Sequence, residues 1–249
     1  MPRTIHQTTL SKQRIPHGCR IDLEFRTDGD LVPGVLMLPD GDEPAPAALL
    51  LHGYSSRKEH LADSIGRGLL GHGIANLAID LPLHGSRGDP LQAQSLRNPL
   101  QIASLWRTAL GDGALATRYL AAHPRIDGDS LAVVGYSMGA FLAVQLAAAE
   151  PALRTVALAA GGDLPSGTPL AGVARMVADP LRAVRKLRGR PLLMVHGRWD
   201  RTVTPDQAER LFAAAEEPKE IRWWDAGHYL PHAAIDEAAH WLATRLATA

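Results

Sequence analysis

Short apolar runs alternate with amphipathic segments along most of the chain. Apolar strand candidates lie at residues 47–51, 74–79, 131–134, 155–159, 191–195 and 220–224. Helical candidates lie at residues 59–70, 99–122, 141–149, 205–215 and 232–247. Gly111 and Gly113 predict a weak point in the second of these helices. Apolar strands that alternate with helices are typical of a mostly parallel sheet covered by helices on both faces. The pattern therefore predicts an α/β fold.

Two segments depart from this alternation. Residues 20–25 and 31–38 alternate apolar and polar positions around the turn-forming residues 27–30, which predicts an antiparallel hairpin at a sheet edge. Residues 161–189 separate two strand candidates and are longer than a simple connection, so we expect a small helical cap over the strand ends. We see no internal repeat. We expect a single domain over residues 1–249 that includes this cap.

Charge and composition narrow the classes of partner. The 249 residues are 46% hydrophobic, which is enough to build a sizeable core. Lys plus Arg and Asp plus Glu both number 26, so no net field favours nucleic acid or an anionic membrane. A small neutral or weakly charged molecule is the expected partner. The expected cap contains a local cluster of five basic residues: Arg182, Arg185, Lys186, Arg188 and Arg190. We interpret this cluster as a solvated helix face, and the alternative is an anion-binding site.

Cysteine usage and the N-terminal segment bear on the compartment. Cys19 is the only cysteine, which excludes an intramolecular disulfide and a thiolate metal cage. Residues 1–16 contain no apolar signal-peptide core, and no run reaches the roughly 18 apolar residues of a membrane span. We expect a soluble cytoplasmic protein. The oligomeric state does not follow from the pattern.

The pentapeptide Gly-Tyr-Ser-Met-Gly at residues 135–139 lies between a strand candidate and a helix candidate. A sharp strand-to-helix turn would hold Ser137 in an exposed, strained conformation. Glycines two residues before and after the serine remove Cβ atoms that would collide in such a turn. We therefore interpret Ser137 as a nucleophile, and the alternative is a turn serine that caps the helix.

A serine nucleophile needs a general base, and the base needs a group that fixes its tautomer. Asp200 lies in the segment 196–203 (HGRWDRTV) after one strand candidate, and His228 lies in the segment 225–229 (DAGHY) after the next. Active-site groups collect at the carboxyl edge of open α/β sheets, so Ser137, Asp200 and His228 are expected to converge. Asp163 follows another strand candidate and is the rival for the acid.

Attack on a carbonyl creates an oxyanion, which preorganised donors must stabilise. The backbone N–H groups of Met138, at the start of a helix, and Tyr54, in a loop after the strand 47–51, are the candidates. His228 and His232 have helical i,i+4 spacing, but neither an HExxH pattern nor a third ligand accompanies them. We expect no metal and no cofactor.

Five segments occur in the order found in the α/β-hydrolase family: LHGYSSRKE, AIDLPLHGSRGD, VVGYSMGA, HGRWDRTV and AGHYL. The chain resembles that family from the first hairpin to the terminal helix. Within it, the chain looks like the small bacterial serine esterases related to dienelactone hydrolase and to the catalytic domain of prolyl oligopeptidases. The resemblance implies the α/β-hydrolase fold with about eight strands, a cofactor-free triad and acyl transfer to water.

One departure from these relatives bears on the substrate. Dienelactone hydrolase has a cysteine nucleophile, whereas this chain carries Ser137, which favours carboxylic esters over dienelactone. The pair His84-Gly85 is expected to shape a loop beside the active site, with direct substrate contact as the alternative. Four aromatic residues are candidates to line an acyl or alcohol pocket, although such residues often belong to the core: Tyr54, Trp106, Phe141 and Tyr229.

Taken together, the motifs predict a carboxylesterase-type serine hydrolase that forms an acyl-enzyme through a Ser-His-Asp triad. A peptidase or amidase of the prolyl oligopeptidase-like group is the nearest alternative, but the sequence offers no obvious site for a peptide amino terminus. A third possibility is a non-catalytic binding module, because a fold alone does not establish catalysis. All the expected triad positions are filled, which disfavours that possibility. The natural substrate does not follow from the pattern.

Overall fold

A twisted sheet of nine strands runs through the described part of the computed structural model, which comprises residues 5–26, 30–92, 98–165 and 175–246. The strand order is β1-β2-β3-β5-β4-β6-β7-β8-β9. The strands are β1 (His6–Ile15), β2 (Gly18–Arg26), β3 (Leu31–Pro39), β4 (Ala45–Leu51), β5 (Ala75–Ile79), β6 (Ile126–Tyr136), β7 (Leu153–Ala159), β8 (Leu192–Gly197) and β9 (Lys219–Trp224). The strands from β4 to β9 pair in parallel, whereas β1, β2, β3 and β5 pair antiparallel in succession.

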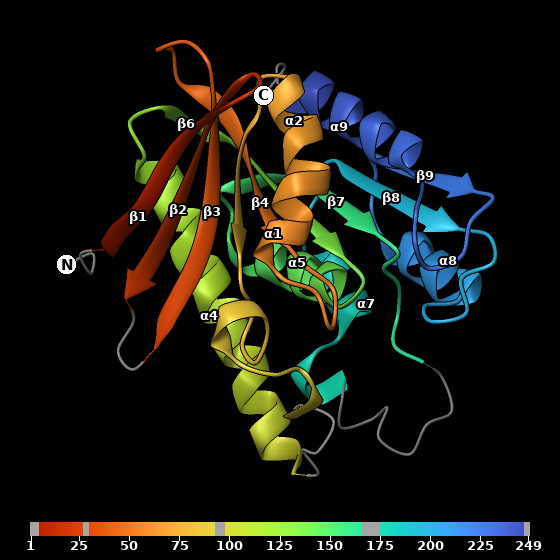
Figure 1. Ribbon diagram of the computed structural model, residues 1–249. Helices are drawn as coiled ribbons and strands as arrows, with labels where there is room; N and C mark the ends of the chain where they lie inside the picture. The colour runs from red at the N-terminus through yellow and green to blue at the C-terminus, as the bar shows by residue number, and fades with distance from the viewer. Residues whose placement is uncertain (1–4, 27–29, 93–97, 166–174, 247–249) are drawn as a thin grey trace.

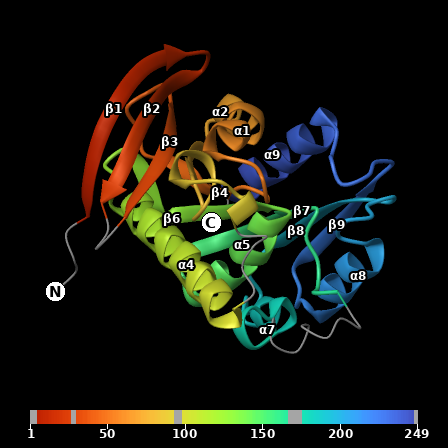
Figure 2. The same ribbon diagram turned by 60° about the horizontal axis from the view of Figure 1, so that its bottom comes forward.

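Helices cover both faces of the sheet (Figure 1). They are α1 (Lys58–Leu61), the π-helical turn η1 (Ala62–Gly66), α2 (Arg67–Gly71), the 3₁₀ turn η2 (Gly85–Arg87), α4 (Pro99–Ala122), α5 (Met138–Ala149), α7 (Pro180–Arg185), α8 (Pro205–Ala214) and α9 (His232–Leu246). Figure 2 shows α4, α5, α7 and α8 on one side of the sheet and α1, α2 and α9 on the other. The predicted α/β-hydrolase fold is confirmed.

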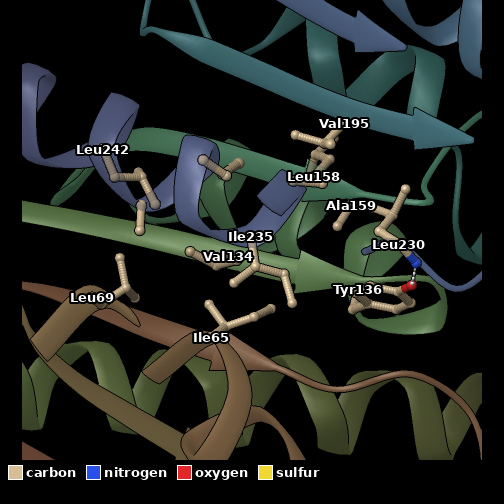
Figure 3. Close-up of a pocket in the computed structure, with 14 residues that line it drawn as sticks. Ile65, Leu69, Val134, Tyr136, Leu158, Ala159, Val195, Leu230, Ile235 and Leu242 are labelled. Atoms are coloured by element: carbon tan, nitrogen blue, oxygen red, sulfur yellow. Dashed lines mark hydrogen bonds between the residues drawn. The ribbon is translucent and has the colours of Figure 1, made fainter. Parts of the chain in front are cut away.

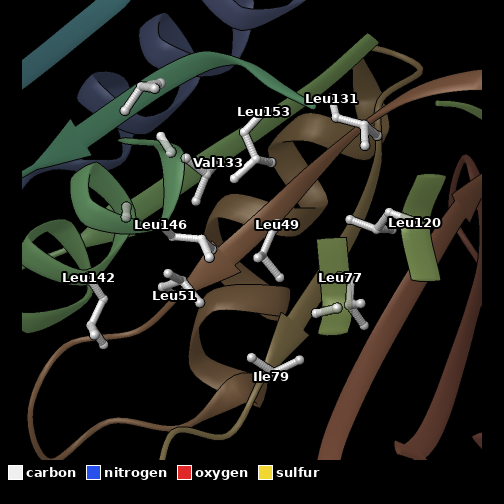
Figure 4. Close-up of a cluster of buried hydrophobic side chains, with 14 of the residues drawn as sticks. Leu49, Leu51, Leu77, Ile79, Leu120, Leu131, Val133, Leu142, Leu146 and Leu153 are labelled. Atoms are coloured by element: carbon white, nitrogen blue, oxygen red, sulfur yellow. The ribbon is translucent and has the colours of Figure 1, made fainter. Parts of the chain in front are cut away.

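The buried apolar residues divide between the two faces of the sheet. In β4, Leu49 and Leu51 belong to the cluster beneath α4 and α5, whereas Ala48 and Leu50 belong to the cluster beneath α2 and α9. Figure 4 shows the first cluster, in which side chains of the central strands meet those of α5. Because both faces of these strands are buried, their sequences are apolar runs without alternation.

The N-terminal strand corrects the predicted edge. The hairpin expected at residues 20–25 and 31–38 is present as β2 and β3, but β1 pairs outside it and forms the edge. The side chains of β1 are exposed at almost every position. An exposed strand carries no apolar period, so the pattern gave no strand candidate at β1. The structure has nine strands among its described residues, against the eight or so that the resemblance implies.

The predicted weak point in the long helix is wrong. Helix α4 runs without interruption from Pro99 to Ala122. A Cβ atom on Gly113 would lie 2.8 Å from Leu146 Cδ2 on α5, so this glycine allows the two helices to approach closely. The cost of glycine in a helix is thus offset by packing against α5.

Part of the expected cap at residues 161–189 lies within the described ranges, and residues 166–174 lie outside them. Its helix α7 packs against α5 and α8. Four of the five basic residues there are exposed, whereas the Arg190 guanidinium donates to the carbonyls of Ala147, Glu150 and Leu153 near the end of α5. Cys19 is buried as a free thiol. None of the helices in the described ranges is long and apolar enough to cross a membrane.

Candidate active site

Ser137 occupies the junction of β6 and α5, at the carboxyl edge of the sheet. Its backbone has φ 52° and ψ −117°, a region that non-glycine residues rarely adopt. The Ser137 N–H donates to the Ala159 carbonyl at 2.9 Å, which ties the turn to β7. A Cβ atom on Gly139 would collide with the Leu51 carbonyl, and one on Gly135 would collide with the Gly139 carbonyl. The expected strained turn is therefore present, and its glycines are required by space.

The structure brings Ser137, His228 and Asp200 together from three separate segments. His228 lies between β9 and α9, and Asp200 follows β8. His228 Nε2 is 2.9 Å from Ser137 Oγ, and its Nδ1 is 2.8 Å from Asp200 Oδ2. Because a carboxylate only accepts hydrogen bonds, Nδ1 carries the ring proton and Nε2 is left to accept from the serine hydroxyl. This tautomer is the one that a general base at His228 requires.

Hydrogen bonds to backbone groups of the loop that carries Asp200 hold this loop in place. Asp200 is buried, and its Oδ1 accepts the N–H groups of Thr202 at 2.8 Å and Val203 at 3.0 Å. The buried ring of His196 on β8 donates from Nε2 to the Val203 carbonyl at 2.9 Å. Burial lowers the pKa of His196, so its ring stays neutral and holds the loop without adding a charge. One carboxylate oxygen therefore remains for His228.

Asp163, the rival for the acid, has different partners. Its Oδ2 lies 2.8 Å from Arg175 Nη2 and 3.0 Å from Arg210 Nε. Burial alone would raise the pKa of Asp163, but the hydrogen bonds from the two guanidinium groups outweigh it and the pKa is lowered. The structure thus places Asp163 in an ion-pair cluster, and the carboxylate beside His228 is that of Asp200.

The two predicted oxyanion donors lie next to Ser137. Met138 is the first residue of α5, so its N–H has no acceptor within the helix. A Cβ atom on Gly53 would lie 3.3 Å from Ser137 Cβ, so the loop after β4 runs directly against the serine. Tyr54 is the next residue in that loop, and its hydroxyl donates to the Pro90 carbonyl at 2.6 Å.

His52 anchors this loop to the one that follows β5. Its Nε2 accepts the Leu81 N–H at 3.1 Å, and its Nδ1–H donates to the Gly53 carbonyl at 2.8 Å. Complete burial lowers the pKa of His52 to about 4. The ring is therefore neutral at neutral pH, as its accepting Nε2 requires. The motifs predict no role for this side chain.

The loop after β5 is built around the buried carboxylate of Asp80. It accepts from the Lys58 N–H, the Lys58 ammonium and the Ser86 N–H, each at 2.9 Å. Burial would raise the pKa of Asp80, but these three donors lower it overall. Gly85 has φ 56°, and a Cβ atom there would collide with the carboxylate. This contact, together with a 2.8 Å bond from His84 Nδ1 to the Pro82 carbonyl, supports the loop-shaping interpretation of His84-Gly85.

Tyr136, which precedes the serine, holds the loop that carries His228. Its hydroxyl donates to the His228 carbonyl at 2.7 Å and accepts the Leu230 N–H at 3.1 Å, the second of which is dashed in Figure 3. Behind the ring lies an apolar cavity of about 30 Å³ between the sheet and α9. The motif identified the serine but gave no signal for this contact, which depends on a residue 92 positions away.

A larger cavity of about 220 Å³ has Met138, the residue that follows Ser137, in its wall. Tyr54 and Trp106, two of the four predicted aromatic residues, contribute to its wall, and Trp106 Nε1 donates to Gln145 Oε1 at 3.0 Å. Phe141 and Tyr229 do not line it. The Tyr229 side chain is 87% exposed, with its ring edge-on to that of His228. In the described ranges, no group of three or more His, Cys, Asp or Glu residues is placed to hold a metal ion.

Comparison with known proteins agrees with this architecture. A family model described as "Alpha/beta hydrolase family" matches residues 48–189. Esterase FrsA of Escherichia coli O157:H7 is 31% identical over 150 residues, which cover 58% of this chain and 32% of that protein. Polyketide transferase ATR5 of Stachybotrys chlorohalonatus is 28% identical over 132 residues, or 53% of this chain and 41% of that protein. The chain thus matches less than half the length of these curated relatives.

Solved structures extend the likeness to almost the whole chain. Acetyl xylan esterase 1 from Thermoanaerobacterium sp. JW/SL YS485 superposes with a TM-score of 0.80 at 20% identity, over 97% of this chain and 88% of that one. TT1662 from Thermus thermophilus gives a TM-score of 0.73 at 25% identity, over 86% and 94% of the two chains. These matches establish a shared fold.

Proposed function

Because the chain belongs to the alpha/beta hydrolase family, we propose that it is a serine hydrolase that cleaves carboxylic esters. The observation that carries the proposal is the continuous contact from Ser137 Oγ through the His228 ring to Asp200 Oδ2. The names of its relatives, among them esterase FrsA and an acetyl xylan esterase, favour esters over amides as substrates.

In the first half of the reaction, His228 Nε2 takes the proton of the Ser137 hydroxyl while Oγ forms a bond to the ester carbonyl carbon. The carbonyl π electrons move to oxygen, and the N–H groups of Tyr54 and Met138 stabilise the resulting oxyanion. The Asp200 carboxylate stabilises the imidazolium and keeps the ring oriented. Collapse of the intermediate breaks the bond to the alcohol oxygen, which receives the proton from His228.

The second half repeats these steps with water. His228 removes a proton from water, and the oxygen attacks the acyl carbon of the acyl-enzyme. The bond from that carbon to Ser137 Oγ then breaks, and Oγ regains a proton from His228. The carboxylic acid leaves, and the triad returns to its starting protonation state. No external oxidant, reductant or cofactor enters this balance.

The test is hydrolysis of p-nitrophenyl esters and of an aminoacyl-arylamide panel by the wild type, Ser137→Ala and the control Ser104→Ala, an exposed serine on α4. We expect ester turnover that falls at least about 10⁴-fold in Ser137→Ala and is unchanged in the control. Full activity in purified Ser137→Ala would refute the assignment. Faster arylamide than ester turnover would favour the amidase, and folded protein without any turnover would favour a binding module.

A further inference from the structure

We propose that the 220 Å³ cavity beside Ser137 binds the acyl portion of the ester, and that this acyl group is uncharged and apolar. The inference rests on the proposed function and adds a substrate class to it. The cavity lies between the loops after β4 and β5 and the helices α4 and α5. The lining residues used below are Tyr54, Ile102, Trp106, Ala109, Met138 and Leu142.

The position of the cavity relative to the triad separates acyl from alcohol. The leaving alcohol must lie against His228, because that ring delivers its proton. The cavity wall contains both residues proposed as oxyanion donors, Tyr54 and Met138, and no described residue from the loops that carry His228 and Asp200. The cavity therefore opens on the side of the carbonyl carbon away from the base. That side is where the acyl substituent lies.

The chemistry of the wall disfavours a charged acyl group. No Lys, Arg, Asp or Glu is found among the described residues that line the cavity. The Tyr54 hydroxyl is engaged by the Pro90 carbonyl, and His84 Nδ1–H donates to the Pro82 carbonyl. The other ring nitrogen of His84, Nε2, is buried without a hydrogen-bond partner and is left as an acceptor. A carboxylate or an ammonium on the acyl chain would lose its hydration here without gaining an ion-pair partner. An alkyl chain or a phenyl ring would lose nothing comparable.

Volume limits the size of this group. A cavity of about 150 Å³ lined by apolar side chains accommodates benzene. The present cavity is larger, which fits a benzoyl-type ring or an acyl chain of roughly six to eight carbons. Each methylene that leaves water for an apolar wall improves binding about fourfold. We therefore expect kcat/KM to rise from acetyl to hexanoyl esters and to level off beyond octanoyl.

Ala109 provides the sharpest test. It is a buried residue of α4 that lines the cavity, so Ala109→Leu places three additional carbons inside it. Ala122→Leu makes the same change at an exposed position of the same helix and serves as the matched control. The substrates are p-nitrophenyl esters that vary only in the acyl chain, and acetate esters that vary only in the alcohol.

In Ala109→Leu we expect the hexanoyl-to-acetyl ratio of kcat/KM to fall at least about tenfold, while acetyl turnover and the alcohol series stay close to the wild type. The control should keep the wild-type ratio. An unchanged acyl ratio would overturn the proposal, as would a change confined to the alcohol series. Wild-type protein that hydrolyses none of these esters would instead refute the proposed function itself.

A second variant guards against misfolding of the first. Trp106→Ala enlarges the cavity and removes the bond to Gln145 together with part of the packing against the core, and it should shift the optimum toward longer acyl chains. The two variants are expected to move the acyl preference in opposite directions. A shift in the same direction would contradict the assignment of this cavity to the acyl group.

Discussion

Asp80 and Asp200 are two buried carboxylates with closely similar positions in the fold. Each follows a strand of the parallel part of the sheet, β5 for Asp80 and β8 for Asp200. Both are almost completely buried, and each accepts two backbone N–H groups. Those shared contacts place both carboxylates firmly in their loops.

The third partner separates the two sites. Asp80 meets the ammonium of Lys58, which also contacts the Glu59 carboxylate at 2.7 Å, and this charge cluster holds the loop. Asp200 meets the imidazole of His228, whose other ring nitrogen contacts the Ser137 hydroxyl. Burial and backbone contacts thus position an acid, whereas its side-chain partner decides whether it can support chemistry.

The largest expected effect comes from removing the charge at the proposed catalytic acid. In Asp200→Asn, the side-chain oxygen can still accept from Thr202 and Val203, but the amide N–H₂ faces His228 and favours the wrong tautomer. We expect kcat for p-nitrophenyl acetate to fall about 10⁴-fold with the fold retained. Activity within tenfold of the wild type would end the functional distinction between the two carboxylates.

The same substitution at Asp80 should act on stability. Asp80→Asn removes one of the two carboxylates that contact the buried Lys58 ammonium, and Glu59, at 2.7 Å, remains. The free energy of unfolding should therefore fall, but by less than the about 3–5 kcal/mol expected for a buried charge that is left without any partner. Urea unfolding measures it, and Asp129→Asn, at a side chain that is 91% exposed, is the control with an expected change below about 0.5 kcal/mol. A larger loss of kcat than in Asp200→Asn, measured on folded protein, would reverse the comparison.

The buried His52 gives a test that depends on pH. The pKa of His52 is lowered from 6.5 to about 4, so between these values the unfolded chain binds more protons and stability falls as the pH falls. Protonation of His52 in the unfolded chain should lower the free energy of unfolding by up to about 3 kcal/mol as the pH falls from 6.5 to 4. We expect the urea-derived free energy of His52→Asn to depend less on pH in this window. Equal pH slopes for the two proteins would contradict a neutral buried His52.

The smallest predicted effect concerns the support of the base. Tyr136→Phe keeps the ring and removes two hydrogen bonds, to the His228 carbonyl and from the Leu230 N–H. Each contributes about 0.5–1.5 kcal/mol, so we expect kcat to fall roughly tenfold with little change in KM. A rise in KM at constant kcat would instead place Tyr136 in substrate binding. The pH profile of kcat checks whether the environment of the base has changed.

The parallel half of the fold could be predicted because its strands are apolar on both faces. The run at residues 131–134 marks the buried part of β6, although the strand extends from Ile126 to Tyr136. Strand β1 could not be predicted in this way, since its stability comes from pairing with β2 and its side chains face solvent. The prediction for Gly113 is wrong for a related reason. This glycine leaves room for Leu146 on the neighbouring helix, and helix propensity, which is a local property, does not describe that contact.

The candidate triad could be predicted because its residues follow strands in a recognisable order. The supporting groups could not, because their partners are distant in sequence. Lys58 and Asp80 are 22 positions apart, and Tyr136 and Leu230 are 94 apart. Each of these pairs exists only after the sheet has aligned the strand ends. The acyl-side cavity likewise results from four separate segments, so aromatic composition alone selected Trp106 and Tyr54 together with Phe141 and Tyr229.

The backbone of Ser137 has a consequence for how this sequence can change. At φ 52° any side chain is strained by about 1–3 kcal/mol, whereas glycine adopts this conformation freely. A Ser137→Gly protein should therefore be more stable than the natural one while lacking its proposed nucleophile. Selection for stability alone would remove the serine. Under the proposed function, mutational drift toward a more stable protein with glycine at this position would be opposed by the loss of the nucleophile.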